Sequence, residues 1–455
     1  MYLVYSLLLT FGFLVLLPRF LFDAFRHGKY VAGFRERLGE LSGIESKGQP
    51  VVWIHCVSVG ESQAARPLVR GIQQRFPNHI LVISTTTLTG QILARQLFRS
   101  AAAKVFYFPF DWRWTVRRAL KAINPSAVLI METELWPGFL RECHSQQIPV
   151  AIVNGRISYQ SFRRYQWISG FVSRVLGCIS LGIMQTEADA ERIRILGLPA
   201  SKVFNSGNLK FDAGTMPSSN SLFGELQQRF NIASETELIL AASTHAPEER
   251  VVLEAFQRLR TGSSQQIKLM LAPRHPERFA DVASLLNSSG LTWTLRSNPP
   301  GPTDEACDVI LLDTIGELPA LYAMAAVVFV GGSIANNGGH NILEPAAVGA
   351  AIVTGANTHN FDDIVKVFAQ SQAIIQLPVL SDGQAAGVLE RVIRELLADK
   401  QRRRELGLRA KRLVQENQGA TLRTLDLLDS LLVSDRQRLS YGTGSGSDRI
   451  QNSTT

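Results

Sequence analysis

A glutamate that follows an apolar run is the first candidate for chemistry in this sequence. The mainly apolar residues 51–57 lead into Ser58-Val59-Gly60-Glu61, which predicts a strand that turns into a helix. Glu61 would then lie at the carboxyl end of a strand, where clefts form in parallel sheets. A carboxylate there could accept a proton from an attacking hydroxyl group. Ser58 and Glu61 also have the spacing of a capping box, and spacing alone favours that interpretation.

The glycine-rich stretch in the carboxy half is the second candidate. Gly331-Gly332-Ser333 follows the apolar run 327–330 and precedes residues 336–345, NNGGHNILEP. Glycines let backbone amides approach an anion, and a helix start favours a phosphate. Pro345 suits the first helical position, so Glu344 is predicted to cap the helix, where it could also bind both ribose hydroxyls. A capping box of Asn341 with Glu344 is the alternative, which Pro345 weakens.

Three more segments carry charge, two of them at the ends of predicted strands and the third near the polar break between the two halves. Arg274 is a candidate phosphate clamp, whereas His275 beside it is more simply structural. Glu132 lies in an apolar setting with Glu134 and could be a substrate-binding carboxylate. Lys210 could stabilise negative charge that develops on a donor. Each of these residues could equally be an exposed or salt-bridged surface group.

Several catalytic signatures are missing from the sequence. It has no GxxxxGK[ST] phosphate loop, no HExxH zinc motif, no GxSxG nucleophile elbow and no clear Asp-x-Asp pair. The four cysteines are scattered, without a CxxC pair, which disfavours a zinc site or a disulfide framework. Metal-independent chemistry is therefore the simpler expectation.

Short apolar runs that alternate with amphipathic stretches must position these residues. This alternation predicts βα units and parallel sheets. A polar break, Met216–Ser221, separates two such series. The sequence thus predicts an α/β fold with two Rossmann-like, doubly wound domains, 26–215 and 222–432, that face a ligand cleft. The Gly/Ser-rich residues 436–455 are predicted to be a disordered tail. The predicted strands are 51–57, 80–84, 105–108, 128–131, 150–154, 182–184, 238–242, 267–271, 309–312, 327–330 and 351–354.

The amino terminus is almost wholly apolar. Met1–Leu17 has no polar face and is followed by Arg19, Arg26 and Lys29. At 1.5 Å per residue this stretch is about long enough to cross or enter a bilayer. Residues 1–25 are therefore predicted to be a membrane anchor with the remainder on the cytoplasmic side; a buried core helix is the alternative. The net charge of +8 also favours an anionic partner.

Taken together, these segments resemble the 3-deoxy-D-manno-octulosonic acid (Kdo) transferases of lipopolysaccharide biosynthesis. The resemblance implies a GT-B fold and an inverting, metal-independent transfer of Kdo from CMP-Kdo to a lipid A precursor. It places the reaction at the cytoplasmic face of the inner membrane, with phospholipid as a partner, no nucleic acid and no cofactor besides the donor. The segments that carry the match are 55–61, 131–137, 154–156, 207–212, 272–275 and 331–345.

The resemblance also implies roles for single residues. Glu61 matches the general base, and Glu132 and Lys210 match positions that assist the transition state. Arg274 and His275 match residues at the CMP phosphate. The remaining matches, all at the nucleotide and with Glu344 on the ribose, are Ile315, Gly316, Glu317, Asn341, Ile342, Leu343 and Glu344.

Two competing hypotheses stay open at this point. Another GT-B enzyme that uses a UDP-sugar, either a transferase or a 2-epimerase, would share the fold. The apolar residues 1–22 count against an epimerase, which needs no membrane acceptor. A non-catalytic membrane scaffold would not need Glu61, Arg274 and Glu344 together.

Overall fold

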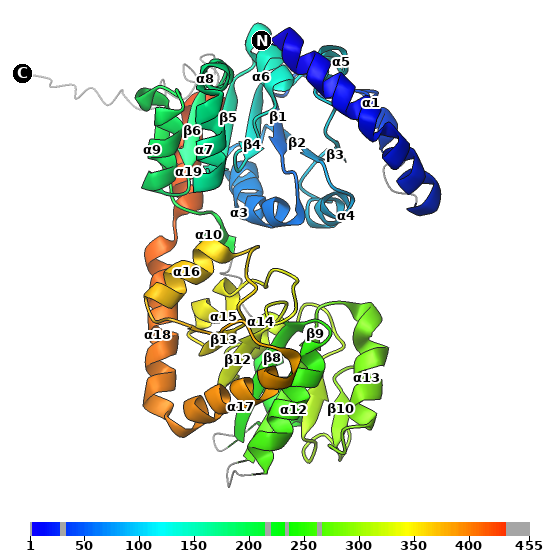
Figure 1. Ribbon diagram of the computed structural model, residues 1–455, viewed down its shortest axis with the longest axis vertical. Coiled ribbons are helices and arrows are strands. Elements are labelled where there is room, and N and C mark those ends of the chain that lie inside the picture. Colours follow the sequence, from blue (N-terminus) through cyan, green and yellow to red (C-terminus); the bar gives the residue numbers. More distant parts are fainter. Residues whose placement is uncertain (1, 28–32, 214–219, 233–235, 262–265, 434–455) are drawn as a thin grey trace, which may run out of the picture. The chain divides into compact units, whose positions relative to one another are not determined.

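The protein folds into two compact units, each built on a parallel sheet (Figure 1). The computed structural model describes residues 2–27, 33–213, 220–232, 236–261 and 266–433. The first unit comprises Met1–Ala213 and Gln418–Thr455, and the second comprises Gly214–Asn417. The predicted disordered tail, 436–455, and most of the predicted polar break lie outside the described residues.

The first unit contains a seven-stranded parallel sheet with the order β3-β2-β1-β4-β5-β6-β7. The order reverses between β1 and β4, which makes this point the expected place for a ligand. Six of its strands were predicted; the seventh has three residues, two of them exposed, and so lacks the apolar run that marks the others. The strands are β1 (Val51–His55), β2 (Ile80–Thr85), β3 (Lys104–Tyr107), β4 (Ala127–Met131), β5 (Val150–Gly155), β6 (Leu181–Met184) and β7 (Val203–Asn205).

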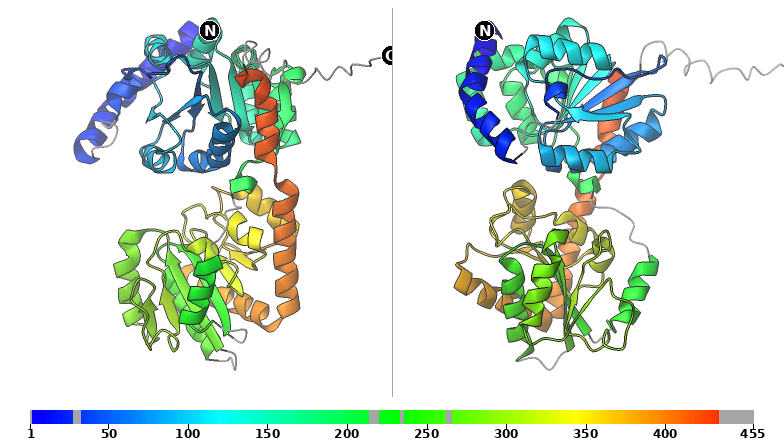
Figure 2. Two further views of the ribbon diagram at one scale, coloured as in Figure 1. Left: turned by 180° about the vertical axis from the view of Figure 1, so that it is seen from behind. Right: turned by 90° about the vertical axis from the view of Figure 1, so that its right-hand side faces the viewer.

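Helices cover both faces of this sheet (Figure 2). Alternate residues of β1 point to opposite faces, so Trp53 and Ile54 enter different cores. The helices are α1 (Tyr2–His27), α2 (Phe34–Arg37), α3 (Val59–Arg75), α4 (Leu88–Leu97), α5 (Arg113–Ile123), α6 (Pro137–Ser145), α7 (Tyr159–Trp167), α8 (Ser169–Leu176), α9 (Glu187–Ile195), the short η1 (Ala200–Lys202), α10 (Lys210–Ala213) and α19 (Ala420–Leu432).

The last helix, α19, belongs to the first unit although it is the last of the chain. Leu425 and Leu428 are buried in the same core as α3. Asp212 accepts hydrogen bonds from the amides of Gly419, at 2.8 Å, and Thr421, at 2.6 Å. The expected second domain, 222–432, therefore ends too late. An amphipathic pattern shows that a helix needs a core but does not show which one.

The second unit contains another seven-stranded parallel sheet, with the order β10-β11-β9-β8-β12-β13-β14. Its order reverses between β8 and β12. The two short strands β10 and β14 were not predicted. The strands are β8 (Thr236–Thr244), β9 (Gln266–Pro273), β10 (Trp293–Leu295), β11 (Val309–Leu311), β12 (Val327–Val330), β13 (Ile352–Thr354) and β14 (Ile375–Gln376).

The helices of the second unit pack around this sheet, and α12 and α17 share its main core. Together the two sheets confirm the prediction of two parallel-sheet α/β domains. The helices are α11 (Asn220–Arg229), α12 (Glu248–Arg260), the short η2 (Pro276–Arg278), α13 (Phe279–Asn287), α14 (Leu318–Leu321), α15 (Leu343–Val348), α16 (Asp362–Gln370), α17 (Asp382–Ala398) and α18 (Lys400–Asn417).

The amino-terminal helix α1 has one packed and one open face. Phe13 contacts Phe110 and Trp112, with ring centroids 5.6 and 5.1 Å apart, so the helix lies along the first unit (Figure 2). Within the described part of the chain, no helix has the length and apolarity needed to cross a membrane. The open face consists of apolar side chains that are each 46–68% exposed, namely Val4, Leu7, Leu8, Phe11, Leu14, Val15 and Leu16.

Candidate active site

Glu61 lies at the start of α3, directly after β1, and is only 6% exposed. One of its carboxylate oxygens, Oε2, accepts a hydrogen bond from the Val57 amide at 2.7 Å, and the other accepts one from the Ser58 hydroxyl at 3.2 Å. Ser58 caps the helix by position but its side chain binds no helix-end amide. The reciprocal capping box is therefore not formed. Burial, and next the charge of Glu132, raise the pKa of Glu61 to about 8.

Glu132 follows β4, the neighbour of β1 at the point where the strand order reverses. Its φ angle of +55° lies in the left-handed region, and such strained non-glycine residues cluster at functional sites. Lys210 Nζ lies 3.3 Å from Glu132 Oε1, and both side chains are largely buried. Burial and Glu132 also raise the pKa of Glu134. The structure thus brings Glu61, Glu132 and Lys210 together at one sheet edge.

Asn154 at the end of β5 completes this edge. It is fully buried, and its φ of +57° is also left-handed. Its Oδ1 accepts the Leu209 amide at 3.0 Å and so fixes the loop that leads to Lys210. Its Nδ2 has no hydrogen-bond partner among the described residues. Unsatisfied buried donors are rare, and the sequence singled out this asparagine only by resemblance.

In the second unit, the backbone amides of residues 332–335, at the start of the glycine-rich loop, are already occupied. The buried carboxylate of Glu248, the first residue of α12, accepts the amides of Gly332, Ser333 and Ile334 at 2.7–2.8 Å. It also accepts those of His245 and Ala335, at 3.0 and 3.2 Å. The expectation that the amides of residues 332–335 are presented to a ligand anion is therefore wrong, because an internal carboxylate occupies that position. Sequence reasoning missed Glu248, although it follows a predicted strand closely.

A pair of stacked histidines lies beside this loop. His245 Nε2 is 2.8 Å from His340 Nε2, and their rings are nearly parallel, 5.0 Å apart. Burial lowers the pKa of His245 to about 4 and that of His340 to about 3, so both are neutral at pH 7. Arg274 and His275 are near enough to lower these pKa values further. His275 is 5.1 Å from the His245 ring, and exposed Arg274 supplies a positive charge there.

Helix α15 starts earlier than expected. Its cap is Ile342 and its first residue is Leu343, whereas Glu344 was predicted to be the cap. Asn341 Oδ1 accepts the Leu343 amide at 3.0 Å, a local turn that begins the helix before Pro345. Asn341 Nδ2 also donates to Glu344 Oε1 at 3.1 Å.

Glu344 and Arg274 share a buried neighbour, Tyr322. Burial raises the pKa of Tyr322, as does the charge of Glu344, while Arg274 acts in the opposite direction. The loop Ile315–Glu317 makes its contacts elsewhere: Glu317 accepts hydrogen bonds from Arg296 Nε at 2.9 Å and from the Thr314 hydroxyl at 2.7 Å. Ile315 is 84% exposed, an open apolar surface of the kind on which a base can rest.

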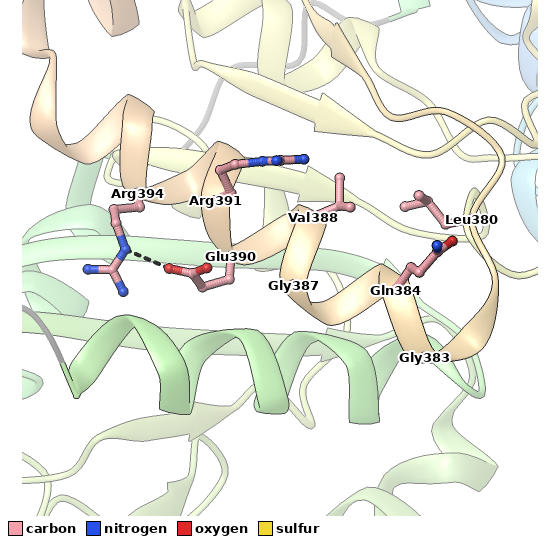
Figure 3. A pocket seen from close by; sticks show the side chains of 8 residues that line it. All are labelled: Leu380, Gly383, Gln384, Gly387, Val388, Glu390, Arg391 and Arg394. Atoms are coloured by element: carbon pink, nitrogen blue, oxygen red, sulfur yellow. Dashed lines mark hydrogen bonds and ion pairs between the residues drawn. The ribbon is translucent and has the colours of Figure 1, made fainter.

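Clusters of metal ligands and surface depressions are the remaining candidates for a site. Across the described residues, no three His, Cys, Asp or Glu side chains come together in a group that could hold a metal ion. A surface depression of about 510 Å³ on α17 contains none of the candidate residues (Figure 3). Within it, Arg394 Nε pairs with Glu390 at 2.5 Å (Figure 3). Its lining consists of Leu380, Gly383, Gln384, Gly387, Val388, Glu390, Arg391 and Arg394.

Comparisons with known proteins identify the family. A family model described as 3-Deoxy-D-manno-octulosonic-acid transferase (kdotransferase) matches residues 32–213. The 3-deoxy-D-manno-octulosonic acid transferase of Haemophilus influenzae is 34% identical over 404 residues, 88% of this chain and 92% of the relative. The transferase of the same description from Bordetella pertussis is 33% identical over 84% of this chain and 87% of the relative.

Solved structures show how widely this fold is shared. A UDP-GlcNAc 2-epimerase from Neisseria meningitidis matches with a TM-score of 0.55 at 12% identity, covering 84% of this chain and all of that one. At this identity the likeness shows a GT-B-type fold alone and gives no support to the UDP-sugar alternative. The sequence relatives, in contrast, match this chain over most of their length. The chain therefore belongs to the 3-deoxy-D-manno-octulosonic acid transferase family, whose activity is glycosyl transfer.

Proposed function

We propose that the protein transfers Kdo from CMP-Kdo to a lipid A precursor in lipopolysaccharide biosynthesis, with inversion and without a metal ion. Family membership supports the reaction class. The observation that carries the site is the buried Glu61, whose pKa is raised to about 8 beside Glu132 and Lys210. A general base works best when its pKa lies near the working pH.

The residues of the first unit account for the acceptor side. Glu61, held by the Val57 amide through one oxygen, takes the proton of the attacking hydroxyl. Lys210 neutralises Glu132 and keeps a positive charge close to the reacting groups. That charge favours a transition state in which negative charge builds up.

The residues of the second unit account for the donor side. Arg274 and His275 bind the phosphate of CMP, which leaves with its negative charge. The neutral His245 and His340 lie beside them. Glu344 accepts hydrogen bonds from the ribose, and the exposed Ile315, with Gly316 and Glu317, lies at the base. Asn341, Ile342 and Leu343 fix the start of α15, which holds Glu344 in place.

The helix α1 brings the enzyme to the inner membrane. Its exposed apolar face is suited to lie in the phospholipid headgroup region while its other face stays on the protein. Arginines on the same unit, including Arg163 and Arg164 of α7, attract an anionic lipid acceptor on the cytoplasmic side.

The test is a transfer reaction with purified protein, CMP-Kdo and a tetra-acylated lipid A precursor in detergent. Mass spectrometry should show the acceptor mass increased by one or more Kdo residues, in the presence of a metal chelator. A UDP-sugar in place of CMP-Kdo should give no product. Transfer from the UDP-sugar alone, or none from CMP-Kdo, would contradict the proposal.

A further inference from the structure

A buried aspartate lies beneath α1 and joins it to the body of the first unit. Asp111 is 3% exposed. Its carboxylate accepts hydrogen bonds from the Tyr5 hydroxyl of α1 at 2.8 Å, and from the amides of Gly138 and Phe139 of α6 at 2.8 and 2.6 Å. Burial raises the pKa of Asp111 to about 6, so the group is still mainly ionised at pH 7. One carboxylate thus holds the first turn of α6 and one side of α1.

Helix α6 continues directly from the segment that carries Glu132. Trp136 is the cap of α6. The segment Glu132–Trp136 therefore leads directly into the first turn of α6, whose amides donate to Asp111. Its other end is fixed by the Glu132 amide, which donates to the Val153 carbonyl at 2.9 Å. The Thr133 hydroxyl accepts the Arg156 amide at 2.9 Å. Asp111 is therefore the fixing point of the carboxyl end of this segment.

The residues on either side of Asp111 also contact α1. Phe110 and Trp112, on either side of Asp111, both contact Phe13. The Trp112 indole donates to the Thr10 hydroxyl at 3.1 Å. Near the start of α1, Tyr2 contacts Phe171 of α8, with ring centroids 5.8 Å apart. The first half of the helix, residues 2–13, is thus held by specific contacts and not only by an apolar surface.

We propose that Asp111 is a positioning residue that ties α1 to the segment Glu132–Trp136, which makes α1 a part of the acceptor side of the active site. This inference rests on the proposed roles of Glu61 and Glu132. Helix α1 then has two functions on two faces. Its open face meets the membrane, and its inner face, through Tyr5 and Asp111, keeps Glu132 at its distance from Glu61.

Substitutions on the two faces of α1 separate these functions. Tyr5→Phe removes one hydrogen bond to a charged group, so kcat on detergent-dispersed acceptor should fall roughly three- to tenfold. The KM for CMP-Kdo and the binding to phospholipid vesicles should not change. Leu8→Gln, on the open face, should weaken vesicle binding and leave kcat in detergent unchanged. Asp111→Asn should lower kcat at least as much as Tyr5→Phe does.

Two readouts distinguish positioning from a general loss of stability. Hydrogen exchange at the Gly138 and Phe139 amides should become faster in Tyr5→Phe. The acid limb of the rate profile should move to lower pH, because Glu132, together with Glu134, helps to raise the pKa of Glu61. Loss of folded protein would lower the amplitude without moving that limb.

One combination of results would overturn the proposed role of Asp111. Unchanged kcat and unchanged exchange at Gly138 and Phe139 in Tyr5→Phe would overturn it, even if Asp111→Asn does not fold. An active Glu61→Gln variant would instead overturn the proposed role of Glu61. The exchange measurement does not depend on activity, so the two failures can be told apart.

Discussion

Glu61 and Glu248 occupy similar places in the two units but have opposite surroundings. Each follows the strand at which the order of its sheet reverses, β1 or β8, and each lies at the start of the next helix. Glu61 accepts one amide and one hydroxyl and has another carboxylate nearby. Glu248 accepts hydrogen bonds from five backbone amides and is fully buried.

The difference shows how the number of donors decides what a buried carboxylate can do. Burial raises the pKa of Glu248 too, but the hydrogen bonds from the surrounding amides act in the opposite direction and stabilise its charge in place. A buried carboxylate with few donors and a like charge beside it gains basicity, as the raised pKa of Glu61 shows. We therefore expect Glu61 to act in the reaction and Glu248 to hold the glycine-rich loop in shape.

The largest expected effect comes from Glu61→Gln. Transfer should fall by more than about a hundredfold, because the amide keeps the shape but cannot act as a base. The affinity for CMP, measured by calorimetry, should stay within about twofold. Glu191→Gln, an exposed acid on α9, is the matched control. Near-normal turnover of Glu61→Gln would contradict the role of Glu61 as the general base, and with it the contrast to Glu248.

Glu248→Gln should act on stability instead of chemistry. A glutamine would direct its NH₂ group at backbone amides that are themselves donors, at a cost of about 2–3 kcal/mol in the free energy of unfolding. Denaturant unfolding would measure this loss, and Glu254→Gln on the exposed face of α12 serves as control. A variant of full stability but with weak transfer would show that Glu248 has a catalytic role after all.

Arg274→Gln should weaken CMP binding by about tenfold, the worth of one charge-assisted hydrogen bond to a phosphate. The free energy of unfolding should hardly change, since Arg274 is exposed. Calorimetry with CMP and with cytidine would separate the phosphate from the base and ribose. Equal losses for both ligands would contradict a contact to the phosphate. Arg250→Gln, exposed on α12, is the control.

The smallest effect is a shift of the pH dependence. Because Glu61 must be unprotonated, kcat/KM should rise with pH and level off above a pKa of about 8. Glu132→Gln removes a nearby negative charge and should move this limb to lower pH, while Lys210→Met should move it to higher pH. Each shift should be about one pH unit or less. Shifts of the same sign in both variants would disprove this coupling.

Apolar runs predicted eleven of the fourteen strands in the described residues, and with them several of the polar residues at the strand ends. Parallel strands present their carboxyl ends together, so the apolar runs before Glu61 and Glu132 placed both residues at one sheet edge. Lys210 follows β7, which was not predicted, and only the resemblance linked it to Glu132. The short strands β7, β10 and β14 were not predicted, because they lack an apolar run of this kind.

The remaining features depend on partners far away in the chain. Four of the five amide donors of Glu248 come from residues 84–87 positions later, and the Tyr5 partner of Asp111 lies 106 positions earlier. No local pattern can show such a contact. The glycines at 331 and 332 suggested an open anion site, yet the anion that fills it is part of the chain. The start of α15 was misplaced because the Asn341 turn outweighed the preference of Pro345 for the first helical position.

The place of α19 has a consequence for how the protein is made. The first unit needs Leu425, Leu428 and Leu432 to close its core over α3, and these residues are synthesised after the whole second unit. A ribosome that has completed residues 1–213 has therefore not yet produced a closed first unit. Until translation nears its end, the part of this core that α19 covers stays open to chaperones or to aggregation. The second unit, Gly214–Asn417, is contiguous and can fold before its partner is complete.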